Sequence, residues 1–313
     1  VIVKIKKSSI CGTDIHIYDW DDWSSKTVKP PMQIGHEWTG VVDSVGSEVN
    51  KYKQGDRVSG EGHVVCGECR NCKAGKRHLC IDQHGIGVHL PGAFAEFLKI
   101  PATNLFSLPD SIPDNIATIF DPLGNAVHAT LSYDLVGEDV LITGAGPIGM
   151  MSALIAQHIG ARHVVVTDIN DYRLNLCKKL GIQHAYHAST NLRELMPTLN
   201  MHEGFDVALE MSGSPSALND IISNVKNGAK IALLGILPED TKISWNEVIF
   251  KDLFIKGIYG REIFETWYKM VSMLESGLNV DQIITHEFHY TEFEKAVQIM
   301  KSGQSGKIIL NWE

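Results

Sequence analysis

The stretch Val140-Leu-Ile-Thr-Gly-Ala-Gly-Pro-Ile-Gly149 decides the fold of the second half of the chain. Its first four residues predict a short buried strand, and the apolar run that follows predicts a helix. A G-x-G-x-x-G pattern is a weak signal alone, but between a strand and a helix it is typical of a dinucleotide-binding turn. Gly144 would allow the tight turn, Gly146 the approach of a pyrophosphate to the backbone, and Gly149 close helix–strand packing. We therefore predict that this turn binds a dinucleotide at the start of the helix.

An acidic residue ends the next predicted strand and indicates which dinucleotide binds. The strand reads His163-Val-Val-Val-Thr-Asp168, and Asp168 lies 24 residues after Gly144. A carboxylate at this place accepts hydrogen bonds from ribose hydroxyls and repels a 2′-phosphate, so the sequence favours NAD over NADP. Arg173 would cover the adenine or pair with Asp168.

The pattern of predicted strands and helices along the chain indicates two kinds of domain. Between Val140 and Leu234, short apolar strands alternate with helices, which is typical of a parallel sheet with helices on both faces. Residues 1 to about 110 instead carry Gly, Pro and short β-like runs, which favour a mostly antiparallel domain. We predict an α/β chain in three segments: a β-rich domain over 1–122, a Rossmann-type doubly wound sheet over 123–263, and a tail over 264–313 that returns to the first domain.

Composition and charge narrow the classes of function. The chain has 313 residues, of which 44% are hydrophobic and 21% charged, as in ordinary soluble proteins. Its net charge of −9 argues against nucleic acid as a partner, and no apolar run is long enough to span a membrane. The chain begins on Val1, already inside a predicted strand, so we expect that an N-terminal piece is missing. Without a targeting segment, the cytoplasm is the expected location.

Four of the six cysteines lie within fifteen residues and predict a metal site. Cys66-Gly-Glu-Cys69-Arg-Asn-Cys72 is followed by Cys80. Four thiolates around zinc form a closed tetrahedral site, so this metal would be structural. The alternatives are an iron–sulfur cluster and free buried thiols, but the gap before Cys80 differs from the bacterial ferredoxin spacing.

A second metal site is indicated by cysteine and histidine in separate segments. These segments are Cys11-Gly-Thr-Asp-Ile-His16, Gly35-His-Glu37 and Gly60-Glu-Gly-His63. Cys and His ligands with one open coordination position are what a catalytic zinc requires.

The order of these motifs resembles that of the zinc-containing medium-chain dehydrogenases, over essentially the whole chain. The shared order is C-G-T-D-x-H, G-H-E, G-D-R-V, the four-cysteine lobe and G-x-G-x-x-G. The resemblance implies a GroES-like fold for the β-rich catalytic domain. Six stretches resemble more narrowly the bacterial members that oxidise L-threonine: Ile17–Trp23, Gly60–His63, Phe120–His128, Gly257–Glu262, Phe264–Lys269 and Ser302–Lys307.

The resemblance also implies roles for individual residues. Cys11, His36 and Glu37 would hold the catalytic zinc, Thr13 and His16 would relay a proton, and Asp121 would assist them. Where alcohol dehydrogenases carry a third zinc-binding cysteine, this chain has Asp121, which leaves the third ligand open between Glu37 and Asp121, with Glu37 favoured. Contacts to NAD map onto Ile148, Asp168, Arg173, Leu234, Gly235, Ile236, Ile258 and Tyr259, besides the three glycines.

The implied activity is the zinc- and NAD-dependent oxidation of the secondary hydroxyl of L-threonine to L-2-amino-3-ketobutyrate, a step of threonine catabolism. The resemblance further implies two zinc ions in each subunit and a homotetramer. A polyol dehydrogenase acting on sorbitol or butanediol is the nearest alternative. A non-catalytic protein that binds NAD and zinc is a third reading, but it predicts broken relay or metal residues. We expect Asp14, Trp20, Trp23 and His63 either to orient the substrate or to serve only in packing.

Overall fold

The computed structural model describes residues 1–313, and its contacts divide them into two compact units. Unit 1 comprises Val1–Pro122, Glu262–Ser276 and Ile284–Glu313, and unit 2 comprises Leu123–Arg261 and Gly277–Ile283. The grouping differs from the predicted segments mainly at 277–283, which fall in unit 2. The reason is burial: Val280 and Ile283 are fully buried, and the turn Asp281–Ile283 lies against a helix of unit 2. No helix has both the length and the apolar character needed to cross a membrane.

Unit 1 is built on a seven-stranded sheet in which both ends of the chain take part. The strand order is β14-β15-β1-β2-β3-β7, with β6 also paired to β1. All pairs are antiparallel except β14 with β15. The strands are β1 (Ile2–Ser9), β2 (Glu37–Ser44), β3 (Arg57–Gly60), β6 (Phe97–Lys99), β7 (Leu105–Ser107), β14 (Ile284–His289) and β15 (Lys307–Asn311).

The register of this sheet brings three distant segments together. Ser9, the last residue of β1, pairs with Glu37 at the start of β2 and with Ile309 in β15. The segment after β1 therefore lies beside the first residues of β2 and of β15. The helices assigned to this unit are α1 (Gly12–Asp19), α2 (Asp22–Thr27), α3 (Arg70–Lys73), α4 (Asp114–Thr118), α11 (Glu265–Glu275) and α12 (Phe293–Lys301).

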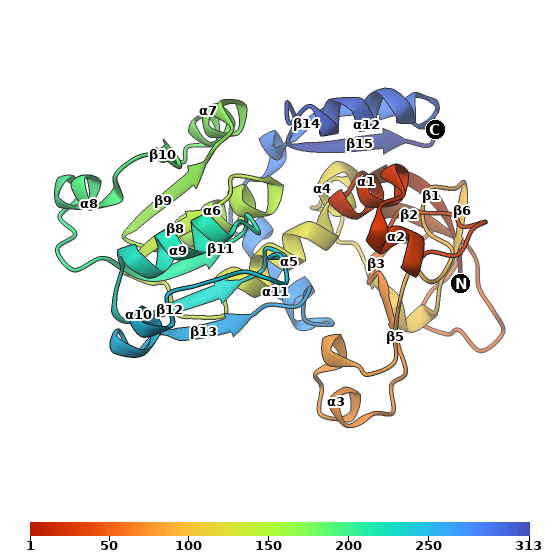
Figure 1. The fold of residues 1–313 in the computed structure, drawn as a ribbon. Helices are drawn as coiled ribbons and strands as arrows, with labels where there is room; N and C mark the ends of the chain where they lie inside the picture. The colour runs from red at the N-terminus through yellow and green to blue at the C-terminus, as the bar shows by residue number, and fades with distance from the viewer. The chain divides into compact units, whose positions relative to one another are not determined.

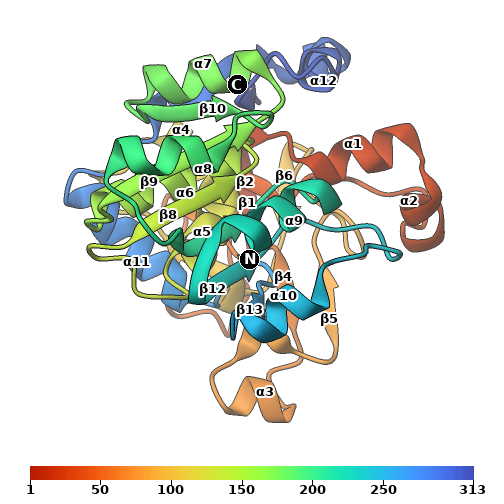
Figure 2. The same cartoon turned by 60° about the vertical axis from the view of Figure 1, so that its left-hand side comes forward.

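Unit 1 has two further local features, an interrupted helix and the cysteine lobe. The sequence pattern over 114–131 predicts a single helix, but the structure breaks it at Ile119 into α4 and α5 (Phe120–Thr130). Pro122 explains the break, because proline is tolerated in the first turn of a helix and not in its interior. The cysteine lobe lies between the paired strands β4 (His63–Val65) and β5 (Gln83–Gly85), and it protrudes from the rest of the unit in Figure 1 and in Figure 2.

Unit 2 is a doubly wound parallel sheet, which confirms the predicted fold class. Its strand order is β10-β9-β8-β11-β12-β13, and every pair is parallel. The chain runs outward from β8 to β10 and then outward on the other side from β11 to β13. Right-handed crossovers then place the helices that follow β8 and β9 on one face of the sheet and those that follow β11 and β12 on the other. The strands are β8 (Asp139–Thr143), β9 (His163–Asp168), β10 (His184–His187), β11 (Phe205–Glu210), β12 (Val225–Leu233) and β13 (Phe254–Gly257), and the helices are α6 (Pro147–His158), α7 (Asp171–Lys179), α8 (Leu192–Leu195), α9 (Pro215–Asn224) and α10 (Trp245–Phe250).

Candidate active site

The four cysteines of the lobe form one cluster. The Sγ atoms of Cys66, Cys69, Cys72 and Cys80 all lie within 4.8 Å of one another. Cys80 Sγ is 3.5 Å from Cys66 Sγ and 4.0 Å from Cys69 Sγ. A tetrahedron with zinc–sulfur distances of about 2.3 Å has sulfur–sulfur edges of about 3.8 Å, so the cluster has the dimensions of a four-thiolate zinc site.

Backbone amides prepare this cluster for negative charge. The amides of Cys69 and Cys72 each donate to the preceding sulfur, and those of Cys66 and Asp82 donate to Cys80 Sγ. Hydrogen bonds from the backbone lower the pKa of Cys69 to about 6, whereas burial and the neighbouring thiols raise the pKa of Cys72 to about 12. Four thiolates cannot share this space without a cation, and a divalent metal supplies one.

A second cluster joins Cys11, His36 and Glu37. Their ligand atoms also lie within 4.8 Å of one another. Cys11 is the N-cap of α1, and His36 and Glu37 stand at the entry to β2, which pairs with the end of β1. Sheet register therefore brings together two motifs that are far apart in the sequence. Asp121 is not one of the three clustered ligands, although it is buried in the same unit and its charge acts on His36.

The surroundings of His36 favour a cation. Burial alone would lower the pKa of His36, but Cys11, Asp14 and Asp121 outweigh it and raise the pKa well above its ordinary value. Asp14 is fully buried, with Oδ1 at 3.9 Å from His36 Nδ1, and its Oδ2 accepts a hydrogen bond from the Cys11 amide at 2.8 Å. Asp14 thus holds the backbone of Cys11 by a hydrogen bond and acts on His36 through its charge, since neither Asp14 Oδ1 nor His36 Nδ1 has a hydrogen-bond partner.

Two polar residues that sequence reasoning missed stand behind Glu37. Lys307, the first residue of β15, is 4% exposed, and its Nζ donates to Glu37 Oε2 and to the Ile10 carbonyl at 2.8 Å. Ser9 Oγ donates to the same Glu37 oxygen. Burial would lower the pKa of Lys307, but Glu37 outweighs it and raises the pKa. The only sequence signal was the position of Lys307 at the end of the Ser302–Lys307 stretch.

The predicted relay residues lie on α1. Thr13 Oγ1 is 3.8 Å from Cys11 Sγ, so the hydroxyl borders the metal cluster. The His16 side chain is 63% exposed, and its Nδ1 lies 2.6 Å from Asp21 Oδ2. Asp21 also caps α2 by accepting from the Ser24 amide, so it is itself fixed in place.

The other residues considered for substrate contact are placed as follows. Trp20 and Trp23 are both nearly half exposed, and the ring of Trp23 meets the ring of His16 edge-on. His63 lies beside the buried carboxylate of Glu61, which also accepts from the indole of Trp267 at 3.2 Å. Glu61 therefore ties the segment before the lobe to α11.

The glycine turn in unit 2 has the geometry that its sequence predicts. Gly144 has φ +94°, which favours glycine, and a Cβ on Gly149 would lie 1.9 Å from the Gly144 carbonyl oxygen. Gly146 has open space where a Cβ would be, and it is the N-cap of α6, with no side chain satisfying the first amides. The turn therefore leaves backbone donors facing free space at a helix start, which suits a phosphate group.

Asp168 and Arg173 border a cavity of about 480 Å³ beside this turn. Asp168 accepts from the amides of Ala145 at 2.6 Å and Asn170 at 2.8 Å, and each of its oxygens retains further acceptor capacity. Arg173 Nη1 lies 4.0 Å from Asp168 Oδ2. The cavity lies at the carboxyl ends of β8, β9 and β11, where doubly wound sheets bind their ligands.

A buried carboxylate that sequence reasoning missed shapes the neighbouring turn. Glu210, at the end of β11, accepts from the amides of Ser212 and Gly213 at 2.8 and 3.0 Å. Gly235 packs so closely there that a Cβ would lie 2.3 Å from Glu210 Oε2. Among the other predicted cofactor contacts, Leu234 and Gly235 donate to the Glu210 carbonyl, Ile236 and Tyr259 are exposed, and Ile258 is buried.

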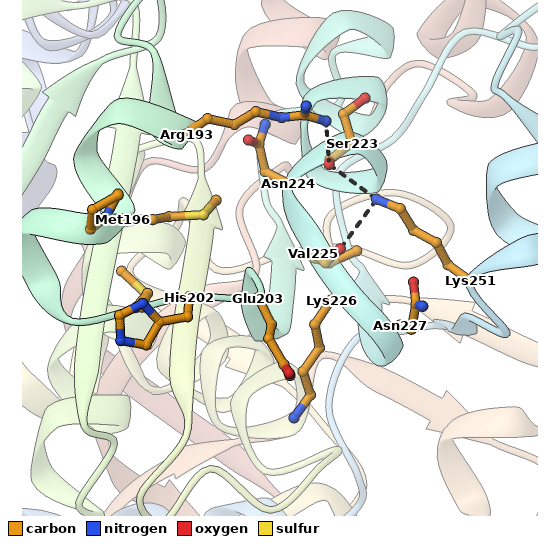
Figure 3. A pocket seen from close by; sticks show the side chains of 12 residues that line it. Arg193, Met196, His202, Glu203, Ser223, Asn224, Val225, Lys226, Asn227 and Lys251 are labelled. Atoms are coloured by element: carbon orange, nitrogen blue, oxygen red, sulfur yellow. Dashed lines mark hydrogen bonds between the residues drawn. The ribbon is translucent and has the colours of Figure 1, made fainter.

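A further cavity of unit 2 lacks these features. It has a volume of about 650 Å³ and is lined by residues such as Arg193, Lys226 and Lys251 (Figure 3). Arg193 donates to the Ser223 carbonyl, and Lys251 donates to the carbonyls of Ser223 and Val225 (Figure 3). These two side chains therefore cap the end of α9 and do not form an anion-binding site.

Comparisons with known proteins place the chain among dehydrogenases. Residues 1–110 match the family model of the alcohol dehydrogenase GroES-like domain, and residues 147–276 match that of zinc-binding dehydrogenases. The L-threonine 3-dehydrogenase of Idiomarina loihiensis is 59% identical over 100% of this chain and 92% of its own length. An alcohol dehydrogenase from Escherichia coli, solved with NADH, superposes with a TM-score of 0.91 at 28% identity, over 100% of this chain and 91% of the other. The galactitol-1-phosphate dehydrogenase of Escherichia coli superposes with a TM-score of 0.89 at 26% identity, over 99% of this chain and 92% of the other.

Proposed function

We propose a function from one premise: the chain belongs to the zinc-containing medium-chain dehydrogenase family. Like that family, it is a zinc- and nicotinamide-dependent oxidoreductase. Within the family, we infer that it oxidises the secondary hydroxyl of L-threonine to L-2-amino-3-ketobutyrate, with NAD as hydride acceptor. One observation carries the choice of substrate: identity is 59% to an L-threonine 3-dehydrogenase and only 26% to a polyol-phosphate dehydrogenase of the same fold.

The residues proposed to hold the catalytic zinc are Cys11, His36 and Glu37. Their clustered ligand atoms and the anionic surroundings of His36 support this assignment, and Glu37 is favoured over Asp121 because it belongs to the cluster. Zinc bound by these residues supplies Lewis acidity, which lowers the pKa of an alcohol hydroxyl. We assign Asp121 a supporting role through its charge on His36.

The proton of the substrate hydroxyl leaves through Thr13 and His16 in this proposal. Thr13 can accept and donate through one oxygen, and it borders the metal cluster. His16 is exposed and can pass the proton to water, while Asp21 holds its other nitrogen.

The residues proposed to hold NAD surround the cavity beside the glycine turn. Gly144, Gly146 and Gly149 would form the pyrophosphate turn, and Asp168 would accept hydrogen bonds from the ribose. NAD bound there supplies the hydride acceptor. Further contacts are assigned to Ile148, Arg173, Leu234, Gly235, Ile236, Ile258 and Tyr259.

The four cysteines are proposed to hold a second, structural zinc. The lobe is short of buried apolar side chains, and Cys72 is the only buried member of the four. A closed thiolate site would therefore supply order that packing cannot. Because four clustered thiols need a reducing environment, we also propose a cytoplasmic location.

We further propose a homotetramer. β13 is an edge strand of its sheet, and exposed apolar side chains gather in α10 and β13. Phe250 is 81% exposed, and Trp245, Ile249 and Phe254 are each more than half exposed. An apolar edge strand of this kind is suited to pair with a second copy, and two such pairs would make up the tetramer that the family resemblance implies.

A substrate panel tests the proposed function. L-threonine, sorbitol and 2,3-butanediol are compared by kcat/KM with NAD in the zinc-loaded protein. We expect L-threonine to be preferred by at least about 100-fold, since a site built to bind a substrate's polar groups strongly rejects analogues that lack them. A higher kcat/KM for either polyol would identify a polyol, and not L-threonine, as the substrate. No turnover with any of the three compounds would favour a non-catalytic protein.

A further inference from the structure

Lys307 is a buried cation placed directly behind a metal-binding residue. Its side chain is 4% exposed, and its Nζ contacts the Glu37 carboxylate and the Ile10 carbonyl. Lysine is almost never buried unless it is paired. Since the pair joins β15 to β2 across 270 residues of sequence, the fold has brought this cation to Glu37 specifically.

The hydrogen bonds on Glu37 are one-sided. Lys307 Nζ and Ser9 Oγ both donate to Oε2. The other carboxylate oxygen, Oε1, is buried and has no hydrogen-bond partner. A buried acceptor left without a partner is costly, so its place in the Cys11–His36–Glu37 cluster calls for a cation there.

We propose that Lys307 is a positioning residue that holds Glu37 as a weak, one-oxygen ligand of the catalytic metal. The inference rests on the proposed function, because it takes this cluster as the catalytic zinc site. Lys307 occupies Oε2 and offsets the carboxylate charge, so only Oε1 remains to face the metal. The thiolate and the carboxylate together would neutralise a dication, and Lys307 restores part of the positive charge that polarises a substrate hydroxyl.

The charge of Lys307 determines the direction of the expected effect. Replacing Lys307 by a neutral side chain removes a cation close to the metal and leaves Glu37 with both oxygens and its full charge. The carboxylate then becomes a stronger donor, and the metal should be held more tightly. A purely structural role predicts the reverse, because a loosened strand β15 would release the metal faster.

The test measures how fast zinc leaves the protein. The variants are Lys307→Met, the charge-preserving Lys307→Arg, and Lys6→Met as a matched control, since Lys6 pairs with Glu313 at the surface. Zinc transfer to an excess of a chromophoric chelator is followed in the fully loaded proteins, and the four-cysteine site serves as an internal reference. We expect Lys307→Met to slow release from the catalytic site by about tenfold, which is the size, with the opposite sign, of the affinity losses that changes behind metal ligands usually cause. Lys307→Arg should remain closer to the parent, and Lys6→Met should match it.

Ser9→Ala covers the case in which Lys307→Met does not fold. This variant removes the second donor to Oε2 without changing a charge, so it should slow release in the same direction and by less. Unchanged or faster release in Lys307→Met, or faster release in Ser9→Ala, overturns the role of Lys307. If the parent protein holds a single zinc, in the four-cysteine site alone, the proposed catalytic metal fails as well. The two failures are therefore distinguishable.

Discussion

Two alanine substitutions in one turn should separate folding from cofactor binding. Gly149 and Gly146 belong to the same motif but meet different surroundings. A Cβ on Gly149 would lie 1.9 Å from the Gly144 carbonyl oxygen, 1.5 Å short of the 3.4 Å at which ordinary contact begins. A Cβ on Gly146 meets no atom within 4 Å.

The magnitudes follow from these contacts. In Gly149→Ala the backbone of the turn or α6 must move, which costs about 3 kcal/mol, at the upper end for overpacking. In a unit of this size, that loss lowers Tm by about 6 to 12 °C. Gly146 has φ −66°, which alanine adopts freely, so Gly146→Ala should change stability by less than about 1 kcal/mol.

NAD affinity, unlike stability, should be affected directly by Gly146→Ala. The methyl group of Gly146→Ala occupies the space that a pyrophosphate would approach. Loss of hydrogen bonds between a charged phosphate and the backbone should weaken NAD binding about 10- to 100-fold. Calorimetric titration with NAD and thermal unfolding of the free protein measure both effects. Parent-like NAD affinity in Gly146→Ala would refute the placement of the pyrophosphate, and a parent-like Tm in Gly149→Ala would refute the packing argument.

Three further substitutions test the choice of cofactor, the structural zinc and an ion pair of unit 2. Asp168→Ser should lower kcat/KM for NAD and raise it for NADP, because the repulsion of a 2′-phosphate is removed; a purely structural Asp168 would leave the ratio of the two cofactors unchanged. Cys72→Ser should reduce the zinc content from two ions to one and lower Tm, and a variant that still holds two ions would show that the lobe does not bind zinc. Burial would raise the pKa of Asp206, but hydrogen bonds from Lys226 and the Asp139 amide lower it. A lowered pKa in the folded state stabilises the protein above the ordinary pKa of about 3.9, and this contribution is lost as the pH falls through the folded value. Lys226→Met should therefore lower the stability at pH 7 by no more than about 1 kcal/mol, and this loss should shrink as the pH falls below the ordinary pKa of about 3.9; a loss that does not depend on pH would contradict the pairing.

Local motifs explain why much of the fold and site could be predicted. The glycine turn and the four-cysteine lobe are each complete within about fifteen residues, so spacing alone reports their chemistry. The alternation of strands and helices likewise predicts a parallel sheet without knowledge of distant contacts.

The features that escaped prediction depend on residues far apart in the sequence. Lys307 and Glu37 are 270 residues apart, and Glu61 and Trp267 are 206 residues apart. No local pattern marks a lysine at the start of a strand as buried, because lysine is ordinarily a surface residue. The sequence does not predict the strand β10, His184–His187, because two of its four residues are polar and it is too short to show a period.

Cys11, His36 and Glu37 are proposed to form an open zinc site that carries the chemistry, apart from the closed cysteine site. The most direct measurement is zinc content together with L-threonine turnover in Cys11→Ser. We expect this variant to hold one zinc per chain, to retain NAD binding and to lose turnover by several orders of magnitude. Two zinc ions with turnover equal to the parent would contradict it.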